Sequence, residues 1–277
     1  MFEQPVLLQN LGDSYTNKVV ERINRFAYMP NDLIDSLAAD ALSQNWGTNN
    51  FVLKKYLAVH VAWSIEQDRY TVGGDQFYVT AGHLQTRYGT PLYLAFSKNR
   101  NAGREPYYLV AAGSKISAPQ LPIPPDIPAE PVLPDRAEIV MMHDHILGDN
   151  ASRFPWLNQT PRVAQMCAIS GAIQWSINRG LHLPQWYFGR MTYVVPLYLQ
   201  SREDITAAPD LIAPVQVNPD SLLVRTVLLP HMAYGNSRVA VKRHDQLPHW
   251  LISAWDEYAD SMTEAEIDNP ETPDSEG

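Results

Sequence analysis

The stretch ISAPQLPIPPDIPAEPVLP, residues 116–134, divides this chain in two. Seven of its nineteen residues are proline. Proline lacks the backbone N–H and fixes φ, so neither a helix interior nor a central strand accepts this density. We therefore expect polyproline II that connects two folded lobes. An SH3 or WW ligand is the alternative, but no Arg or Lys closely flanks a PxxP motif.

Before this connector, a helical pattern is followed by a strand pattern. An apolar stripe with a 3.6-residue period predicts a helix that begins at Asn31 or Asp32 and stops near Gly47, which suits the position just past a helix end. A second stripe predicts a helix over about 51–66. A two-glycine turn and β-branched or aromatic runs predict strands at 69–72, 76–79, 91–96 and 107–112.

After the connector, strands are expected around one confident helix. That helix lies between Thr160-Pro161 and Gly180. Its expected buried residues are Val163, Met166, Cys167, Ile173 and Ile177. The expected strands are 136–142, 186–199 (broken by Gly189 and Pro196), 222–229 and 237–242, and a last helix is expected over about 247–259.

These patterns predict an α+β fold, a single two-lobed domain of helices and mainly antiparallel strands. The expected boundaries are an N-terminal extension over 1–24, a domain over 25–255 and an acidic disordered tail over 256–277. Within the domain, one lobe covers 25–115, the proline-rich connector covers 116–134 and the second lobe covers 135–255.

The charge of the chain is concentrated in that tail. Of 30 acidic residues, nine lie after residue 255, which leaves 21 against 21 Lys and Arg in the rest. A balanced body argues against strong non-specific binding of nucleic acid. The tail is interpreted as a solubility segment, and a nucleic-acid mimic that competes for a cluster of arginines is the alternative.

Several features favour a cytoplasmic protein. The single cysteine, Cys167, cannot form an intramolecular disulfide and is expected to be a buried structural thiol. Met1-Phe2-Glu3 does not start a signal peptide. The uncharged run 163–178 is too short and too polar to span a bilayer, so no membrane association is expected.

The densest polar cluster is His143-Asp144-His145, followed by Asp149, Asn150 and Arg153. It lies between an expected strand and an expected helix, where α/β proteins often expose functional side chains. Helical spacing would bring His145, Asp149, Asn150 and Arg153 to one side. His and Arg together suit a phosphodiester, although such a loop is more often a structural hydrogen-bond network. No metal site is predicted, because HExxH and a Cys partner are absent.

Further candidates come from arginines and aromatic residues elsewhere. Arg225 is expected inside an apolar strand, where it must reach a carboxylate or face a site. The other candidates are Arg87, Tyr88, Trp186, Tyr187 and Arg238. Aromatic rings of this kind stack on unpaired bases, and at strand spacing they are more often core residues.

These motifs together resemble a known family. The motifs are Phe26-Ala27-Tyr28, Leu53-Lys54-x-Tyr56-Leu57, Thr86-Arg87-Tyr88-Gly89, Lys98-Asn99, His145-Ile146-x3-Asn150-x2-Arg153-Phe154-Pro155, Pro184-Gln185-x-Tyr187 and Ala233-Tyr234-x-Asn236-x-Arg238. In this order they are similar to the DUF3825 family, a domain of unknown function. The resemblance implies no activity. It implies an RNA context, since such domains are found joined to OST-HTH (LOTUS) and cold-shock or S1-like modules.

Three hypotheses of function follow. The first is an RNA-associated protein that binds single-stranded RNA or a nucleotide in a cleft between the lobes, without a cofactor. In it, Arg87, Arg153 and Arg238 hold phosphate, Tyr88 and Tyr187 stack on bases, and His145, Asn150 and Asn236 complete the lining. The second is a phosphodiesterase or nuclease with Asp144 and His145 as acid and base. The third is a non-catalytic assembly module in which these residues form a buried network between the lobes.

Overall fold

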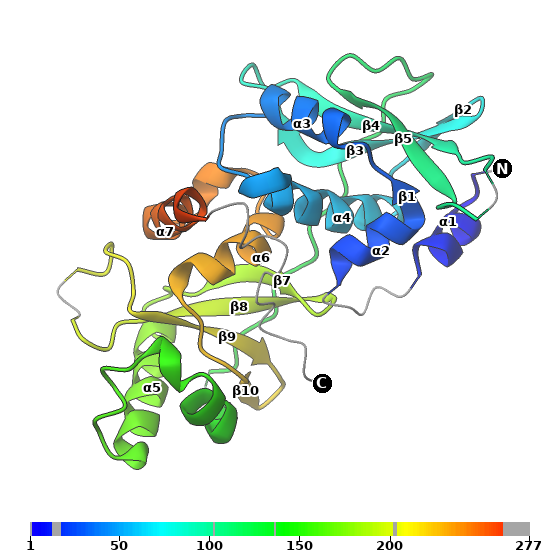
Figure 1. The fold of residues 1–277 in the computed structure, drawn as a ribbon. Helices are drawn as coiled ribbons and strands as arrows, with labels where there is room; N and C mark the ends of the chain where they lie inside the picture. Colours follow the sequence, from blue (N-terminus) through cyan, green and yellow to red (C-terminus); the bar gives the residue numbers. More distant parts are fainter. Residues whose placement is uncertain (1, 13–17, 102, 136, 202–203, 263–277) are drawn as a thin grey trace. The chain divides into compact units, whose positions relative to one another are not determined.

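The boundary between two compact units falls inside the proline-rich segment, between Pro125 and Asp126. The computed structural model describes residues 2–12, 18–101, 103–135, 137–201 and 204–262 (Figure 1). The first unit contains residues up to Gly12, 18–125 and the chain from Trp255 onward, and the second contains 126–254. Each unit has its own mostly antiparallel five-stranded sheet with helices, which confirms the α+β class.

The sheet of the first unit has the order β1-β5-β4-β3-β2. Its strands are β1 (Ala27–Tyr28), β2 (Thr71–Gly73), β3 (Gln76–Gln85), β4 (Pro91–Lys98) and β5 (Tyr107–Gly113). Only β1 and β5 run parallel, with Tyr28 directly opposite Tyr108. The β2–β3 hairpin and the next two strands lie where the apolar patterns predict them.

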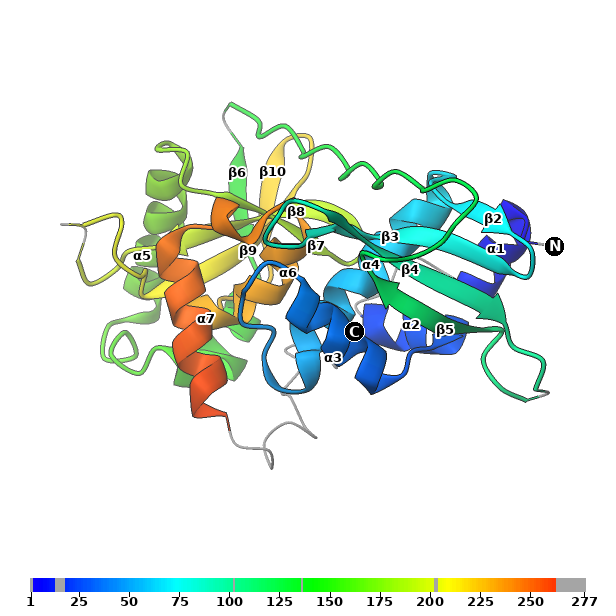
Figure 2. The same ribbon diagram turned by 90° about the horizontal axis from the view of Figure 1, so that it is seen from above.

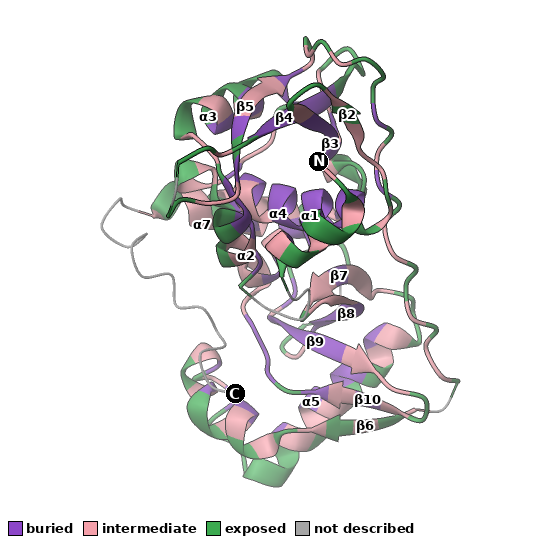
Figure 3. Cartoon of the chain, turned by 90° about the vertical axis from the view of Figure 1, so that its right-hand side faces the viewer, coloured by how far each residue is buried: buried purple, intermediate pink, exposed green. Residues whose placement is uncertain are grey.

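The helices of this unit are α1 (Gln4–Leu11), α2 (Val19–Phe26), α3 (Asn31–Asp40) and α4 (Phe51–Glu66), with the short 3-10 helix η1 (Thr48–Asn50) before α4. Helix α4 is buried on nearly every side, as its purple colour in Figure 3 shows. Leu7 and Ile23 are fully buried, so the segment expected as an extension contributes to this core. Helix α3 ends at Asp40, so the prediction for Gly47 is wrong. Gly47 lies in the following loop, where Trp255 leaves no room for a Cβ.

The second unit has a sheet of order β6-β10-β9-β8-β7. Its strands are β6 (Glu138–Met141), β7 (Leu183–Tyr187), β8 (Arg190–Leu197), β9 (Leu211–Val217) and β10 (Ser221–Val224). Helix α5 (Arg162–Ile177) shares a hydrophobic core with β8, β9 and β10. As in the first unit, one pair is parallel, here β6 with β10.

Two burial predictions for α5 are wrong. Val163 is 70% exposed and the Cys167 thiol is exposed as well. The buried face instead contains Gln165, Ile169, Ala172, Ile173 and Ser176. Apolar residues occur around the whole helix, so their pattern alone could not identify the face that packs on the sheet.

Pro196 does not break the strand as predicted. It lies inside β8, opposite Ile212 of β9. The neighbouring Leu197 carbonyl accepts a hydrogen bond from the Asp210 N–H, on the side of β9. The backbone groups of Pro196 therefore face the side of β7, where the pairing of β7 with β8 ends at Val194. A residue without an N–H is tolerated there. Its carbonyl accepts a hydrogen bond from Ser176 Oγ at 2.5 Å.

The predicted strand over 237–242 is also wrong, because this segment begins in helix α6 (Tyr234–Val239), which follows the 3-10 helix η4 (Pro230–Ala233). Strand β10 ends at Val224, so Arg225 lies outside it and is exposed. After the 3-10 helix η5 (His244–Gln246), helix α7 (His249–Ser261) places Trp250 and Leu251 in the second unit and Trp255 in the first.

The proline-rich segment has neither helix nor strand over 116–134 and runs extended (Figure 2). In the first unit, Gln120 accepts a hydrogen bond from Thr71 Oγ1 at 2.7 Å. In the second unit, the Pro131 carbonyl accepts one from Tyr193 Oη, also at 2.7 Å. The connector is therefore bonded to the folded part of each unit. Helix α7 (His249–Ser261) extends into the expected disordered tail, 256–277, and the tail lies outside the described residues from 263 onward.

No helix within the described ranges is long and apolar enough to cross a bilayer.

Candidate functional site

The candidate site of the second unit lies where β6 and β10 end. These strands run parallel, with Met141 opposite Val224, and the Met142 N–H donates to the Val224 carbonyl at 3.0 Å. The carboxyl ends of parallel strands meet at one edge of a sheet, where ligands commonly bind. The segments that leave this edge are the turn after Met142 and residues 225–227.

The first segment forms a widened turn. It consists of a π-helical turn, η2 (His145–Asp149), and a 3-10 turn, η3 (Ala151–Arg153). Ile146 and Phe154 anchor it, because both belong to the core of the second unit. The Asn150 N–H and its side-chain Nδ2 both donate to the His145 carbonyl, at 3.1 and 2.9 Å. π-Turns are rare and are often found at functional sites.

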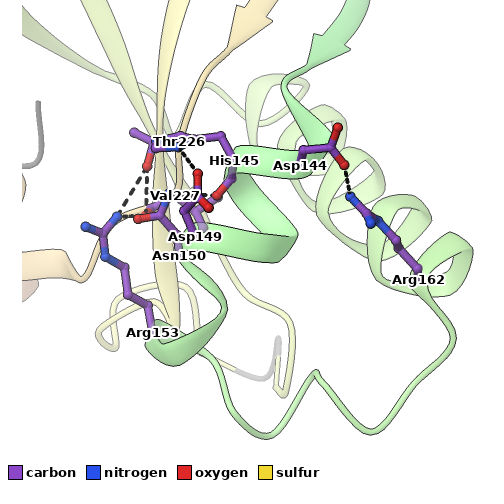
Figure 4. Close-up of polar contacts among 8 residues, drawn as sticks. All are labelled: Asp144, His145, Asp149, Asn150, Arg153, Arg162, Thr226 and Val227. Carbon is purple, nitrogen blue, oxygen red and sulfur yellow. Dashed lines mark hydrogen bonds and ion pairs between the residues drawn. The ribbon is translucent and has the colours of Figure 1, made fainter. Parts of the chain in front are cut away.

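His145 and Asp149 form a pair on this turn. His145 Nδ1 lies 3.0 Å from Asp149 Oδ2 (Figure 4). The imidazole is 39% exposed and the carboxylate 76%. Nε2 of His145 has no hydrogen-bond partner among the described residues. A carboxylate that orients one ring nitrogen leaves the other to exchange a proton with a ligand.

Asp144 is not the partner of His145. Its side chain is 99% exposed and forms an ion pair with Arg162, at the start of α5 (Figure 4). The nuclease hypothesis pairs Asp144 with His145, although helical spacing also places Asp149 on the same side as His145. Consecutive residues on a helical turn point in different directions, however, and a spacing of four brings Asp149 to His145 instead.

Asn150 and Arg153 hold the turn in place. Asn150 is buried, with 6% of its surface exposed. Arg153 Nη1 donates to the Val227 carbonyl at 2.8 Å and lies 3.3 Å from Thr226 Oγ1 (Figure 4). These bonds join the turn to the segment after β10. These bonds give both Asn150 and Arg153 a structural role.

The predicted residues on α6 and β7 are less accessible. Arg238 is 1% exposed, and its Nη1 donates to the Val241 carbonyl at 3.1 Å. Asn236, on the same helix, is half-buried. Tyr187 is half-buried at the end of β7 and packs edge-on against Phe188. A buried guanidinium already bonded to a carbonyl is poorly placed to clamp a phosphate from solution.

Arg87 and Tyr88 belong to the first unit. They lie in the exposed turn between β3 and β4, where Arg87 Nη2 donates to Tyr88 Oη at 2.6 Å. The guanidinium carbon lies 4.7 Å from the centre of the Tyr88 ring. Tyr88 is 78% exposed. That these two residues share a site with His145 stays a prediction.

Arg225 joins the candidates by its position. It is exposed, directly follows β10 and precedes the two residues that Arg153 contacts. It forms no ion pair with any residue in the described part of the chain. The sequence signal was an arginine in an apolar run, but the sequence could not show that the strand stops just before it.

The site contains no cluster typical of a metal centre. Among the described residues, no three His, Cys, Asp or Glu side chains gather as they would around a metal ion. The polar groups of the site are an imidazole, a guanidinium and one carboxylate. This set suits a phosphate-bearing ligand that needs charge and a proton acceptor.

Comparison with known proteins gives one match. No curated protein and no solved structure matches the chain. A family model does match, over residues 37–247, and its description is a domain of unknown function, DUF3825. The match covers most of the chain, including Arg87, His145, Arg153 and Arg238. The chain therefore belongs to the DUF3825 family.

Proposed function

We propose that this protein binds single-stranded RNA or a nucleotide, with the phosphate at the edge where β6 and β10 end. The observation that carries the proposal is the pairing of these strands, which brings the His145 turn and Arg225 to the same edge. An exposed guanidinium donates hydrogen bonds to phosphate oxygens, and His145 Nε2 also does so when the imidazole carries both protons. A cytoplasmic location is part of this proposal, since it suits the exposed thiol of Cys167.

The test is fluorescence anisotropy with short labelled single-stranded RNA at two salt concentrations. The balanced body charge predicts few phosphate contacts and a moderate salt dependence. Arg225→Ala should weaken binding about tenfold and reduce the salt dependence by one charge. Lys242→Ala is the matched control, because Lys242 is also an exposed cation of the second unit. It follows α6, which packs against β7, the strand at the opposite end of the sheet order from β6 and β10.

Arg225 is a sharper probe than the arginines predicted from sequence. Arg153→Ala or Arg238→Ala would disturb internal hydrogen bonds, so a loss of binding could reflect a loss of structure. If no RNA binds at low salt, or if Arg225→Ala and Lys242→Ala bind equally well, the proposal is wrong.

A second candidate function is cleavage of a phosphodiester, and the His145–Asp149 pair favours it. His145 Nε2 would accept the proton of a 2′-hydroxyl as its oxygen forms a bond to phosphorus. The bond from phosphorus to the leaving 5′ oxygen breaks, and that oxygen takes a proton from water. General base catalysis of this kind typically contributes about 100-fold or more to a rate.

Two carboxylate variants separate the structure-based assignment from the sequence-based one. If the protein cleaves labelled RNA, His145→Ala and Asp149→Asn should both slow the reaction. Asp144→Asn should leave the rate unchanged, since Asp144 is bonded to Arg162 instead. Intact RNA after incubation with wild-type protein would exclude cleavage and leave binding alone.

The third hypothesis is a non-catalytic assembly module with a buried network between the lobes. The hydrogen bonds from Asn150 to the His145 carbonyl and from Arg153 to the Val227 carbonyl give both residues a structural role, but these bonds lie inside the second unit. The hypothesis also does not explain the exposed Arg225. RNA binding that depends on Arg225 would therefore decide between the two.

A further inference from the structure

The surface of the first unit contains a hollow whose lining does not include Arg87 or Tyr88. It has a volume of about 580 Å³ and lies where β1, the end of β4 and the start of β5 meet. The loop between β4 and β5 stands out from this end of the sheet (Figure 2). Its aromatic and charged lining residues are two tyrosines, Tyr28 and Tyr108, three cations, Lys98, Arg100 and Arg104, and one carboxylate, Glu105. We call it the Tyr28–Tyr108 hollow.

The two tyrosines are neighbours on one face of the sheet. Tyr28 and Tyr108 are opposite each other in the parallel pair of β1 and β5. Neighbouring strands lie roughly 4.8 Å apart, so the two rings start side by side. Side chains alternate along a strand, and Tyr107 points into the core against Phe26. Tyr108 is therefore directed outward.

Both rings are more exposed than the tyrosines in the core of this unit. Tyr28 is 56% exposed and Tyr108 is 38% exposed, whereas Tyr56, Tyr78 and Tyr93 are all under 9%. Exposed rings beside a hollow provide an apolar face on which a flat group can stack. A planar nucleobase fits that description, because every base has a π face.

The charge of the hollow is positive. Three cations against one carboxylate leave an excess of two positive charges, although the body of the chain is balanced. The only ion pair described for these cations joins Arg100 to Asp75 at 3.7 Å. Both side chains are largely exposed, and such pairs contribute little. Lys98 and Arg104 form no ion pair with a described residue.

From this combination we infer that the Tyr28–Tyr108 hollow binds a nucleotide unit, with the base on the tyrosines and the phosphate on the cations. A bare phosphate would need no aromatic face, and an acidic peptide offers no flat ring to the tyrosine pair. The volume lies within the range of small-molecule pockets. The nucleotide is either free or part of a single strand. The inference does not depend on the site proposed in the second unit.

The experiment measures anisotropy of a labelled ten-residue adenosine RNA bound to the full chain. The double variant Tyr28→Ala/Tyr108→Ala should weaken binding at least about tenfold, because stacking on the rings is lost. Tyr28→Phe/Tyr108→Phe should bind like wild type, since phenylalanine keeps the stacking face. All replaced residues are exposed, and circular dichroism checks that each variant folds.

A second pair of variants tests the charge. Arg100→Ala/Arg104→Ala should weaken binding and reduce the slope of log affinity against log salt by about two. Arg25→Ala is the control, because Arg25 is an 80% exposed cation of the same unit that pairs with Glu21 on α2. It should change affinity by less than about twofold.

Competition distinguishes the sources of the ligand. If AMP displaces the labelled RNA at concentrations at which inorganic phosphate does not, one nucleotide is sufficient for binding. Competition by unlabelled RNA alone would mean that a strand is required, and either result supports the inference. Three results would overturn it: wild-type affinity in the double alanine variant, equal competition by phosphate and AMP, or equal competition by an oligoglutamate peptide. If Arg225→Ala has no effect while the tyrosine variants do, the proposed function fails and this inference stands.

Discussion

A single glycine in β3 determines how closely α4 can pack on the sheet. Gly82 has a φ of +60°, and a Cβ there would lie 2.7 Å from His60 Cγ and 2.7 Å from Tyr56 Oη. Tyr56 Oη also accepts the His83 N–H at 2.9 Å, just after the glycine. Gly82→Ala should therefore cost about 1–2 kcal/mol for the left-handed backbone and about 1–3 kcal/mol more for overpacking.

Urea denaturation measures this cost, and Gly74→Ala is the matched control. Gly74 has a similar φ of +62°, but no atom lies within 4 Å of its Cβ position. Gly74→Ala should therefore lower the free energy of unfolding only by the cost of the left-handed backbone. Equal losses at the two positions would show that close packing at Gly82 does not matter.

At the level of elements, the His145 turn depends on its link to the segment after β10. Arg153→Ala removes the hydrogen bonds to Thr226 and Val227 and should lower the free energy of unfolding by about 1–3 kcal/mol. Arg162→Ala removes only the exposed ion pair with Asp144 and should leave stability nearly unchanged. Chemical denaturation of both variants compares them, and an equally small effect would show that Arg153 does not anchor the turn.

The same elements show what sequence patterns can and cannot predict. Helix α4 was predicted with its observed ends, because its stripe of apolar residues is long. The sequence 237–242 predicts a strand, because Ser237, Val239 and Val241 occupy every second position, as the residues on one face of a strand do. A helix of only six residues gives too short a pattern to overrule that alternation.

The sequence alone could not predict which distant residues contact each other in the candidate sites. The cluster around His145 could be recognised because its members lie within a few positions of each other. Helical spacing predicts Asp149 on the same side as His145, and the structure pairs these two side chains. No local pattern indicated the π-turn that holds them. The Tyr28–Tyr108 hollow depends on a two-residue strand that pairs with a segment 80 positions away. Neither strand length nor pairing of that kind can be inferred from periodicity.

At the level of the whole molecule, stability should fall as the pH drops below neutrality. Burial lowers the pKa of His182 below its ordinary value of 6.5, although Glu130 opposes the shift. Burial also lowers the pKa of His231. In the unfolded chain both imidazoles take up protons from about pH 6.5 downward, while the folded chain resists protonation. The unfolded state then binds more protons, so the free energy of unfolding decreases as pH falls through this window.

Thermal unfolding at pH 7.5 and pH 5.5 tests this account. The wild-type chain should have a lower Tm at pH 5.5, and His182→Gln/His231→Gln should show a smaller decrease, because a glutamine amide does not titrate. His249→Gln is the control, since His249 is an exposed histidine of the same chain. Hydrogen bonds from Thr206 lower the pKa of Asp204, and carboxylates of this kind lose stabilisation only near pH 4 and below. The window between pH 7.5 and 5.5 therefore isolates the histidines, and an unchanged decrease in the double variant would mean that other groups cause it.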